Sequence, residues 1–337
     1  MTVNDTPASG PSGRRAPLDR NLALELVRAT EAAALAASRH LGRGDKELVD
    51  QAAVDAMRPV LNTVSMRGVV VIGEGEKDEA PMLYNGEEVG DGTGPEVDFA
   101  VDPVDGTTLA AKSLPNALAI VAVSERHSMF DPGPCVYMEK IACAGDLADV
   151  VDFSDPIETT LAHIAKARGV AVPELTVCVL DRPRHDDLVG RIREAGSRIK
   201  FLLDGDVAGA IMAANPDTNV DLMIGTGGTP EGVLAACALK CMGGAFYGKL
   251  APRNDDERTR ALDAGYDLDK VLTLDDMVRG DNVFVAASGV TDGELLRGVR
   301  YSADRATTHS ISMRSRSGAV RTIETRHRIS TSNLVPR

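Results

Sequence analysis

The stretch Asp102-Pro103-Val104-Asp105-Gly106-Thr107 directly follows residues 97–101, an alternating apolar run that is typical of a β-strand. Two carboxylates three residues apart on a turn can both direct oxygen atoms at one hard divalent cation. Gly106 permits close approach of the backbone, and the hydroxyl of Thr107 can hold a water nucleophile. Metal-assisted hydrolysis of a phosphate ester requires these groups, so the stretch predicts a catalytic site at a strand end of an α/β protein.

Hydrophobic periodicity predicts further elements on both sides of this stretch. Two helices and a strand are expected before it and two strands after it, and these elements span 21–40, 46–62, 68–72, 116–123 and 136–143. Residues 78–95 are rich in glycine and acidic residues and show no strong period. We interpret them as a loop or lid over the site.

From about residue 155 helices and strands alternate, which is typical of a second sheet with parallel strands. The helices are predicted at 157–168, 185–195, 206–213 and 230–241, and the strands between them at 175–180, 198–202 and 220–224. Three more strands are predicted at 282–286, 310–314 and 319–325. This pattern favours an α/β protein (α+β layered) of two packed lobes, one formed by 19–154 with 281–330 and the other by 155–280.

The two ends of the sequence are expected to lie outside these lobes. Residues 1–18, rich in Ser, Pro, Gly and Arg, are interpreted as a disordered extension. Residues 334–337, Leu-Val-Pro-Arg, resemble the remnant of a cleaved tag. No secretory leader or membrane span is expected, because no sufficiently long apolar run occurs.

Composition excludes several classes of partner. The formal net charge is −13, which argues against nucleic acid and anionic membranes, since both select for basic surfaces. Aromatic residues make up 3% of the chain and tryptophan is absent, so stacking of nucleobases is not expected either. The five cysteines include no Cys-x-x-Cys pair, which suits a reducing cytosol and predicts a cytoplasmic protein.

Five acidic residues carry the prediction of a metal site. Each is at or next to the end of an expected element and beside glycine-rich sequence: Asp50, Glu74, Asp102, Asp105 and Glu231. A single acid of this kind is more often a solvated charge or a helix cap. Several acids at strand ends instead favour a site for two or three hard cations.

The glycine-rich stretch 225–232 allows two interpretations. Pro230 takes the place of the last glycine of G-x-G-x-x-G, so the dinucleotide-binding fingerprint fails. Gly227 and Gly228 either permit a tight entry into the helix that follows or expose backbone N–H groups to a phosphate. Both interpretations can hold together.

Two arginines form a second candidate site. Arg182 and Arg184 follow a predicted strand and flank a proline, so they are suited to bind a phosphate away from the metal ions; two surface arginines are an equally good interpretation. Asp204 and Asp206 also follow a strand and are suited to sugar hydroxyls or metal, although Asp206 competes as a simple N-cap.

Other polar residues give weaker signals. Tyr137 and Lys140 are candidates for substrate contact, with a core position as the alternative for Tyr137. The six histidines form no cluster with one another or with cysteine, so no zinc site is predicted. His40 and His185 are interpreted as structural or exposed.

The sequence also resembles a known family. Asp-Pro-Val-Asp-Gly-Thr preceded by Gly-Glu-Gly-Glu is similar to the lithium-sensitive, metal-dependent sugar phosphatase superfamily. Longer stretches resemble bacterial class II fructose-1,6-bisphosphatase across residues 20–328, and they span 42–46, 72–76, 79–83, 100–107, 137–140, 182–185, 204–207 and 227–232.

The resemblance implies roles for individual residues. It implies that Asp50 and Glu74 bind one divalent ion, that Asp102 and Glu231 bind a second, and that Asp105 lies between metal and phosphate. Thr107 corresponds to the catalytic hydroxyl, with Asp50 as the acid that helps to orient the attacking water. Contacts to the sugar bisphosphate are implied for Asp105, Gly106, Thr107, Tyr137, Arg182, Arg184, Asp204, Asp206 and Gly228. Arg182 stands where some relatives have lysine.

As a whole, the resemblance implies a five-layer αβαβα sandwich that hydrolyses fructose 1,6-bisphosphate to fructose 6-phosphate in gluconeogenesis. It also implies two or three Mg²⁺ or Mn²⁺ ions, inhibition by lithium, and a homo-oligomer, either dimer or tetramer. Three alternatives stay open: action on sedoheptulose 1,7-bisphosphate or an inositol monophosphate, a non-catalytic metabolite-binding regulator, and, weakest, a dinucleotide-binding protein.

Overall fold

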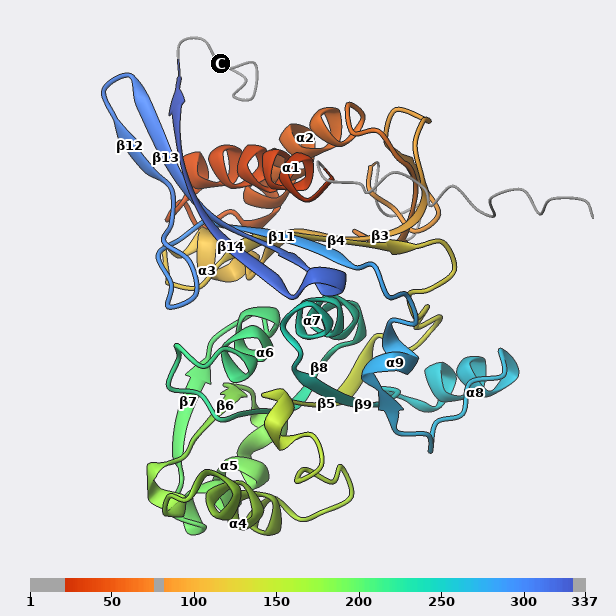
Figure 1. Ribbon diagram of the computed structural model, residues 1–337, viewed down its shortest axis with the longest axis vertical. Helices are drawn as coiled ribbons and strands as arrows, with labels where there is room; N and C mark the ends of the chain where they lie inside the picture. Colours follow the sequence, from red (N-terminus) through yellow and green to blue (C-terminus); the bar gives the residue numbers. More distant parts are fainter. Residues whose placement is uncertain (1–21, 76–81, 330–337) are drawn as a thin grey trace, which may run out of the picture.

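The computed structural model describes residues 22–75 and 82–329, which form five layers of helix and sheet (Figure 1). The order is an outer helical layer, sheet 1, a middle helical layer, sheet 2 and a second outer helical layer. Three buried apolar clusters fill the spaces between these layers. The expected layered α/β fold is therefore confirmed, while the predicted extension 1–18 and tag remnant 334–337 lie outside the described residues.

The first outer layer consists of α1 (Leu22–Ala37) and α2 (Lys46–Leu61), which match the predicted helices closely. α1 is rich in alanine, the residue with the highest helix propensity, and nearly all of it is buried. α2 begins at an N-cap, Asp45, whose side chain accepts a 2.9 Å hydrogen bond from the backbone N–H of Leu48. Both helices pack on the outer face of sheet 1.

Sheet 1 holds the strand that carries the Asp-Pro-Val-Asp-Gly-Thr stretch. Its strand order is β12-β13-β11-β4-β3-β1-β2, with β14 paired to β13. Their bounds are β1 (Arg67–Ile72), β2 (Glu88–Val89), β3 (Glu96–Asp105), β4 (Leu118–Glu125), β11 (Phe284–Gly289), β12 (Arg300–Ser302), β13 (Arg305–Arg314) and β14 (Ala319–Arg328). β1 and β3 are parallel, so their carboxyl ends reach the same edge of the sheet. Residues 82–95 of the predicted loop include β2 beside β1, and residues 76–81 are not described.

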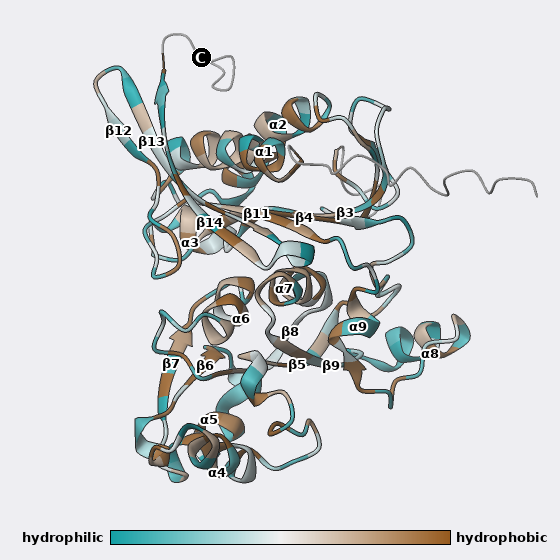
Figure 2. Cartoon of the chain, viewed as in Figure 1, coloured by the Kyte–Doolittle hydropathy of each residue, from teal (hydrophilic) through white to brown (hydrophobic). Residues whose placement is uncertain are grey.

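The middle layer consists of α6 (Val207–Ala214) and α7 (Thr229–Met242), with the short α9 (Leu274–Met277) beside them. All residues of α6 and most of α7 are buried, as expected for helices that are apolar on every side and covered by a sheet above and below. Figure 2 shows the contrast between the apolar strands of sheet 1 and the hydrophilic, peripheral α8 (Asp255–Asp263).

Sheet 2 has the strand order β10-β9-β5-β8-β6-β7. Their bounds are β5 (Tyr137–Cys143), β6 (Thr176–Leu180), β7 (Arg198–Leu202), β8 (Leu222–Gly228), β9 (Ala245–Leu250) and β10 (Leu272–Thr273). The predicted parallel pairing holds for β6 with β7 and β8, whereas β5 and β9 are antiparallel to their neighbours. α4 (Ile157–Arg168) and α5 (Asp186–Glu194) cover the outer face of this sheet.

The chain passes from sheet 1 to sheet 2 between β4 and β5, and it returns between β10 and β11. The division into lobes at residues 154/155 and 280/281 stays a prediction. Among the helices within 22–75 and 82–329, none has the length and apolar character needed to cross a membrane.

Candidate active site

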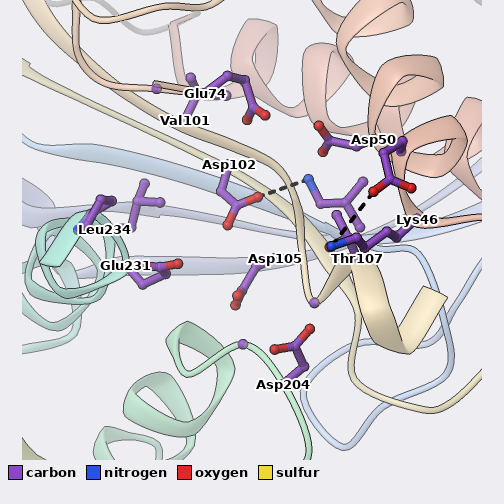
Figure 3. Close-up of a pocket in the computed structure, with 16 residues that line it drawn as sticks. Lys46, Asp50, Glu74, Val101, Asp102, Asp105, Thr107, Asp204, Glu231 and Leu234 are labelled. Atoms are coloured by element: carbon purple, nitrogen blue, oxygen red, sulfur yellow. Dashed lines mark hydrogen bonds and ion pairs between the residues drawn. The ribbon is translucent and has the colours of Figure 1, made fainter. Parts of the chain in front are cut away.

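The five predicted metal ligands line one cavity of about 470 Å³ (Figure 3). They come from three successive layers of the fold: Asp50 from α2, Glu74 from the turn after β1, Asp102 and Asp105 from β3, and Glu231 from the first turn of α7. Thr107, Gly106 and Asp204 line the same cavity. Residues far apart in the sequence thus meet where the middle helix α7 approaches the strand ends of sheet 1.

The Asp-Pro-Val-Asp segment is not a separate turn, as the sequence suggested, but the end of β3. Its pairing with β4 is irregular between Asp102 and Asp105, and Oδ1 of Asp102 accepts a 3.0 Å hydrogen bond from the N–H of Val104. Such an irregularity bends a strand and redirects its side chains, which accounts for two acids three residues apart on one cavity wall. Gly106, with φ of 89°, then starts the short helix α3 (Thr107–Ala111).

The acids of this cavity disfavour one another's charged forms. Burial raises the pKa of Asp102 well above its usual value, and the charges of Glu74, Glu231 and Asp50 raise it further. Burial likewise raises the pKa of Asp105, with added repulsion from Asp102 and Glu231. Bringing a cation among these groups would favour their charged forms.

The donor set fits a hard divalent cation, which binds carboxylate oxygens. Oδ2 of Asp105 and Oε2 of Glu231 are buried and have no hydrogen-bond partner within the described part of the chain. In the same residues no three His, Cys, Asp or Glu side chains form a ready ligand cluster. The carboxylates line the walls of the cavity.

Without metal, this cluster should make the stability of the protein depend on pH. Burial, together with the charge of Asp50 and a hydrogen bond to it, raises the pKa of Glu74 from 4.5 to about 8. Between those values the folded protein retains a proton that the unfolded chain has released, so stability falls as the pH rises. This group contributes at most about 1.4 kcal/mol per pH unit.

Urea unfolding in a chelator from pH 5 to pH 9 measures this dependence. Glu74→Gln should make the decline shallower, because the amide does not titrate. An identical slope for the wild type and the variant would contradict the assignment.

A second, smaller cavity of about 220 Å³ adjoins the first. The two share four lining residues: Asp204, Gly205, Pro230 and Glu231. The remaining predicted substrate-contact residues line this second cavity, namely Tyr137, Arg182, Arg184, Asp206 and Gly228. One continuous site thus has an acidic end and an arginine end.

Both arginines are held by specific contacts. Arg182 donates to Oδ1 of Asp204 at 2.8 Å and to the carbonyl of Leu203 at 2.6 Å. Nε of Arg184 donates to the carbonyl of Thr226 at 2.9 Å, and its guanidinium lies 5.1 Å from the ring centroid of Tyr137. These contacts fix the orientation of the guanidinium groups at the cavity wall.

His185 helps to fix the backbone near these arginines. It is buried, its Nδ1 lies 2.8 Å from the carbonyl of Leu180, and its Nε2 accepts a 2.8 Å hydrogen bond from the N–H of Thr226. Since Nε2 accepts, the proton is on Nδ1 and the ring is neutral. Burial lowers its pKa, which agrees with a structural histidine.

Three residues have surroundings that differ from one of their sequence interpretations. Lys140, considered for substrate contact, has a fully buried side chain that pairs with Asp206 instead. Asp206 does occupy the N-cap position of α6, but its side chain makes no capping hydrogen bond. Tyr137, the alternative core residue, is half-buried at the cavity wall.

Sequence reasoning did not single out two residues that line the site and one that lies beside it. Lys46 and Glu47, in the first turn of α2, line the acidic cavity. The guanidinium of Arg253 lies 5.8 Å from the ring centroid of Tyr137, the same ring that Arg184 contacts. It follows β9, a strand that the sequence pattern did not predict, so its position near the end of a strand could not be recognised.

Comparisons with known proteins show the family to which this chain belongs. A family model described as bacterial fructose-1,6-bisphosphatase, glpX-encoded, matches residues 20–327. A class 2 fructose-1,6-bisphosphatase of Haemophilus influenzae is 42% identical over 323 residues, which cover 92% of this chain and 97% of the relative. Fructose-1,6-bisphosphatase 1 class 2 of Escherichia coli K12 is 42% identical over 321 residues, which cover 91% of this chain and 95% of the relative.

Proposed function

Because the chain belongs to the family of bacterial, glpX-encoded fructose-1,6-bisphosphatases, we propose that its two joined cavities bind one sugar bisphosphate and that the acidic end performs the reaction. The protein is a phosphatase that hydrolyses fructose 1,6-bisphosphate to fructose 6-phosphate and phosphate. This reaction belongs to gluconeogenesis.

The proposal rests on the observation that the two cavities share lining residues and so form one site. A bisphosphate needs two phosphate sites at a fixed separation, and only one of them needs catalytic groups. We assign the 1-phosphate to the acidic cavity and the 6-phosphate to Arg182 and Arg184. Guanidinium groups are suited to a phosphate that is bound and not cleaved, because they donate two parallel hydrogen bonds and keep their charge.

The acidic end requires divalent cations before it can accept a phosphate. We propose two or three Mg²⁺ or Mn²⁺ ions, held by Asp50, Glu74, Asp102, Asp105 and Glu231. When bound, such ions neutralise the phosphate charge and stabilise charge on the attacking and leaving oxygens. The raised pKa values of Asp102 and Asp105 support this assignment, because burial and the charges of neighbouring acids both disfavour their ionised forms, which a bound cation would favour.

The remaining side chains orient the reactants. The hydroxyl of Thr107 and the carboxylate of Asp50 orient the water that attacks phosphorus in line with the leaving oxygen. Asp204, Asp206 and Tyr137, with the backbone at Gly106 and Gly228, contact the sugar between the two phosphates. Phosphoryl transfer asks a protein mainly for positioning and electrostatic stabilisation, which this set of residues is suited to supply.

Release of phosphate tests this assignment. Fructose 1,6-bisphosphate is compared with fructose 1-phosphate, sedoheptulose 1,7-bisphosphate and inositol 1-phosphate, each with Mn²⁺, with Mg²⁺ and with chelator. Metal-dependent turnover that favours the bisphosphates supports both ends of the site. Turnover of inositol 1-phosphate alone would reject the arginine end, and turnover in chelator would reject the metal end.

The arginine end gives a separate prediction. Arg184→Ala should raise KM for fructose 1,6-bisphosphate about 10–100-fold, since a charge-assisted hydrogen bond is worth about 1.5–3 kcal/mol. The value of kcat should change less, and KM for fructose 1-phosphate should not change. Arg193→Ala is the control, because Arg193 also stacks on a ring, that of Phe201 at 5.7 Å, but lines neither cavity. An unchanged KM for the bisphosphate would contradict the assignment.

We also propose a cytoplasmic homo-oligomer, either dimer or tetramer. All five cysteines are free and buried, which supports a reducing compartment. Within the described residues β14 pairs only with β13, and most of its side chains are exposed. An open strand edge of this kind favours pairing with a second copy, which light scattering in solution would test.

A further inference from the structure

A buried lysine lies next to residues that line the active-site cavities. Lys140, on β5, has a side chain with 0% exposure. Its Nζ lies 2.5 Å from Oδ2 of Asp206 and donates a 2.9 Å hydrogen bond to the carbonyl of Gly228. A buried charge is tolerated when it is paired and hydrogen-bonded, and both conditions are met here.

The glycines of the 225–232 stretch make room for this ion pair. A Cβ atom at Gly227 would lie 2.1 Å from Oδ2 of Asp206 and 3.0 Å from Nζ of Lys140. At Gly232 it would lie 2.4 Å from Sδ of Met138 and 3.3 Å from Cδ of Lys140. Besides the two interpretations considered from the sequence, the stretch therefore lets β8 and α7 close around the lysine.

The ion pair contacts both ends of the site. Asp206 lines the arginine cavity. Gly228, whose carbonyl Lys140 holds, lies against Glu231 at the acidic end, because a Cβ atom at Gly228 would be 1.8 Å from Oε2 of Glu231. The ammonium group of Lys140 thus binds Asp206 at the arginine end and the backbone of Gly228, next to Glu231, at the acidic end.

We propose that Lys140 is a positioning residue that fixes the separation between the metal end and the sugar end of the active site. It acts through Asp206 and through the turn 228–231, and it does not contact the substrate. The inference rests on the proposed function, specifically on the roles assigned to Asp206 and Glu231. Loss of Lys140 should weaken metal binding and turnover beyond any effect on the stability of the fold.

The chain offers a matched control in Lys240. Its side chain is also mostly buried, at 13% exposure, and its Nζ binds one carboxylate, Asp275 at 2.8 Å, and one backbone carbonyl, Val278 at 2.7 Å. Lys240 lines neither cavity. The two lysines therefore share their bonding pattern and differ in their connection to the site.

Lys140→Met and Lys240→Met should be compared in the full chain. Calorimetric titration of the metal-free proteins gives Kd for Mn²⁺, kinetics with fructose 1,6-bisphosphate give kcat and KM, and thermal unfolding gives Tm. Supporting partners of metal ligands typically contribute about 10–100-fold, so we expect Lys140→Met to weaken Mn²⁺ binding and lower kcat/KM by that factor. Lys240→Met should change Tm only.

A second comparison covers the case in which Lys140→Met does not fold. Lys140→Met/Asp206→Asn removes both buried charges, which is better tolerated than removing one, and it is compared with Asp206→Asn alone. Mn²⁺ binding should still be weaker in the double variant, because the carbonyl of Gly228 has lost its donor. Equal Mn²⁺ affinity and equal kcat/KM in this pair, or in Lys140→Met and the wild type, would overturn the proposal.

Failure of the proposed function can be distinguished from failure of the proposal for Lys140. A wild-type protein that binds Mn²⁺ but does not hydrolyse fructose 1,6-bisphosphate would reject the function. The ratio of Mn²⁺ affinities between the variants would still report on Lys140.

Discussion

Asp102→Asn should abolish metal-dependent turnover and at the same time stabilise the metal-free protein. Asparagine keeps the acceptor for the N–H of Val104 but removes one negative charge from a wall shared with Glu74 and Glu231. We expect kcat/KM to fall about 10³-fold or more at fixed Mn²⁺, since electrostatic stabilisation dominates such reactions. In chelator at pH 8, stability should rise, because burial and the neighbouring acids disfavour the charged form of Asp102 and the amide carries no charge.

Asp98→Asn is the matched control. Asp98 is a buried acid on the same strand, but its carboxylate is hydrogen-bonded to the protein itself. Its Oδ2 accepts hydrogen bonds from the N–H groups of Ser128 at 2.8 Å and Met129 at 3.0 Å. Replacement should lower stability and leave kcat/KM intact, the reverse of the result at Asp102. If Asp102→Asn destabilised the metal-free protein as Asp98→Asn does, the acidic cavity would be a structural network and not a metal site.

The sequence predicted those elements whose boundaries are marked locally. α4 ends at Arg168 and is followed by Gly169, which has φ of 68°, and β7 lies between glycine-containing turns; both were predicted with the bounds that the structure shows. α8 was missed because only Glu257 and Ala261 are buried on it, so no apolar period exists. Its one local signal is the N-cap Asn254, whose side chain accepts a 2.8 Å hydrogen bond from the N–H of Glu257.

The candidate site also contains residues that could be predicted from the sequence and residues that could not. Glu74, Asp105 and Glu231 could be selected from sequence because each is adjacent to a glycine near the end of an element, and parallel pairing of β1 with β3 then brings two of those ends together. The surroundings of Lys140 could not be predicted. They depend on contact between β5, the start of α6 and the end of β8, and no local pattern encodes the distance between those three segments.

Thr107→Ala should lower kcat by about 10²–10⁴-fold, the usual contribution of a positioned proton-transfer group. Thr107 is the first residue of α3 and lines the acidic cavity. Its hydroxyl has no hydrogen-bond partner within residues 22–75 and 82–329, so removing it costs the fold little. With the 6-phosphate bound at the arginine end, as proposed, KM should change little.

Thr107→Ser separates the hydroxyl from the methyl group. Serine places an oxygen at the same position, so kcat should recover to within about tenfold of the wild type if the hydroxyl orients the attacking water. If Thr107→Ala kept a near-normal kcat, orientation of the water would fall to the carboxylates alone, with Asp50 as the remaining candidate on the cavity wall. A reduced kcat in both variants would instead assign the effect to packing of the Thr107 methyl group.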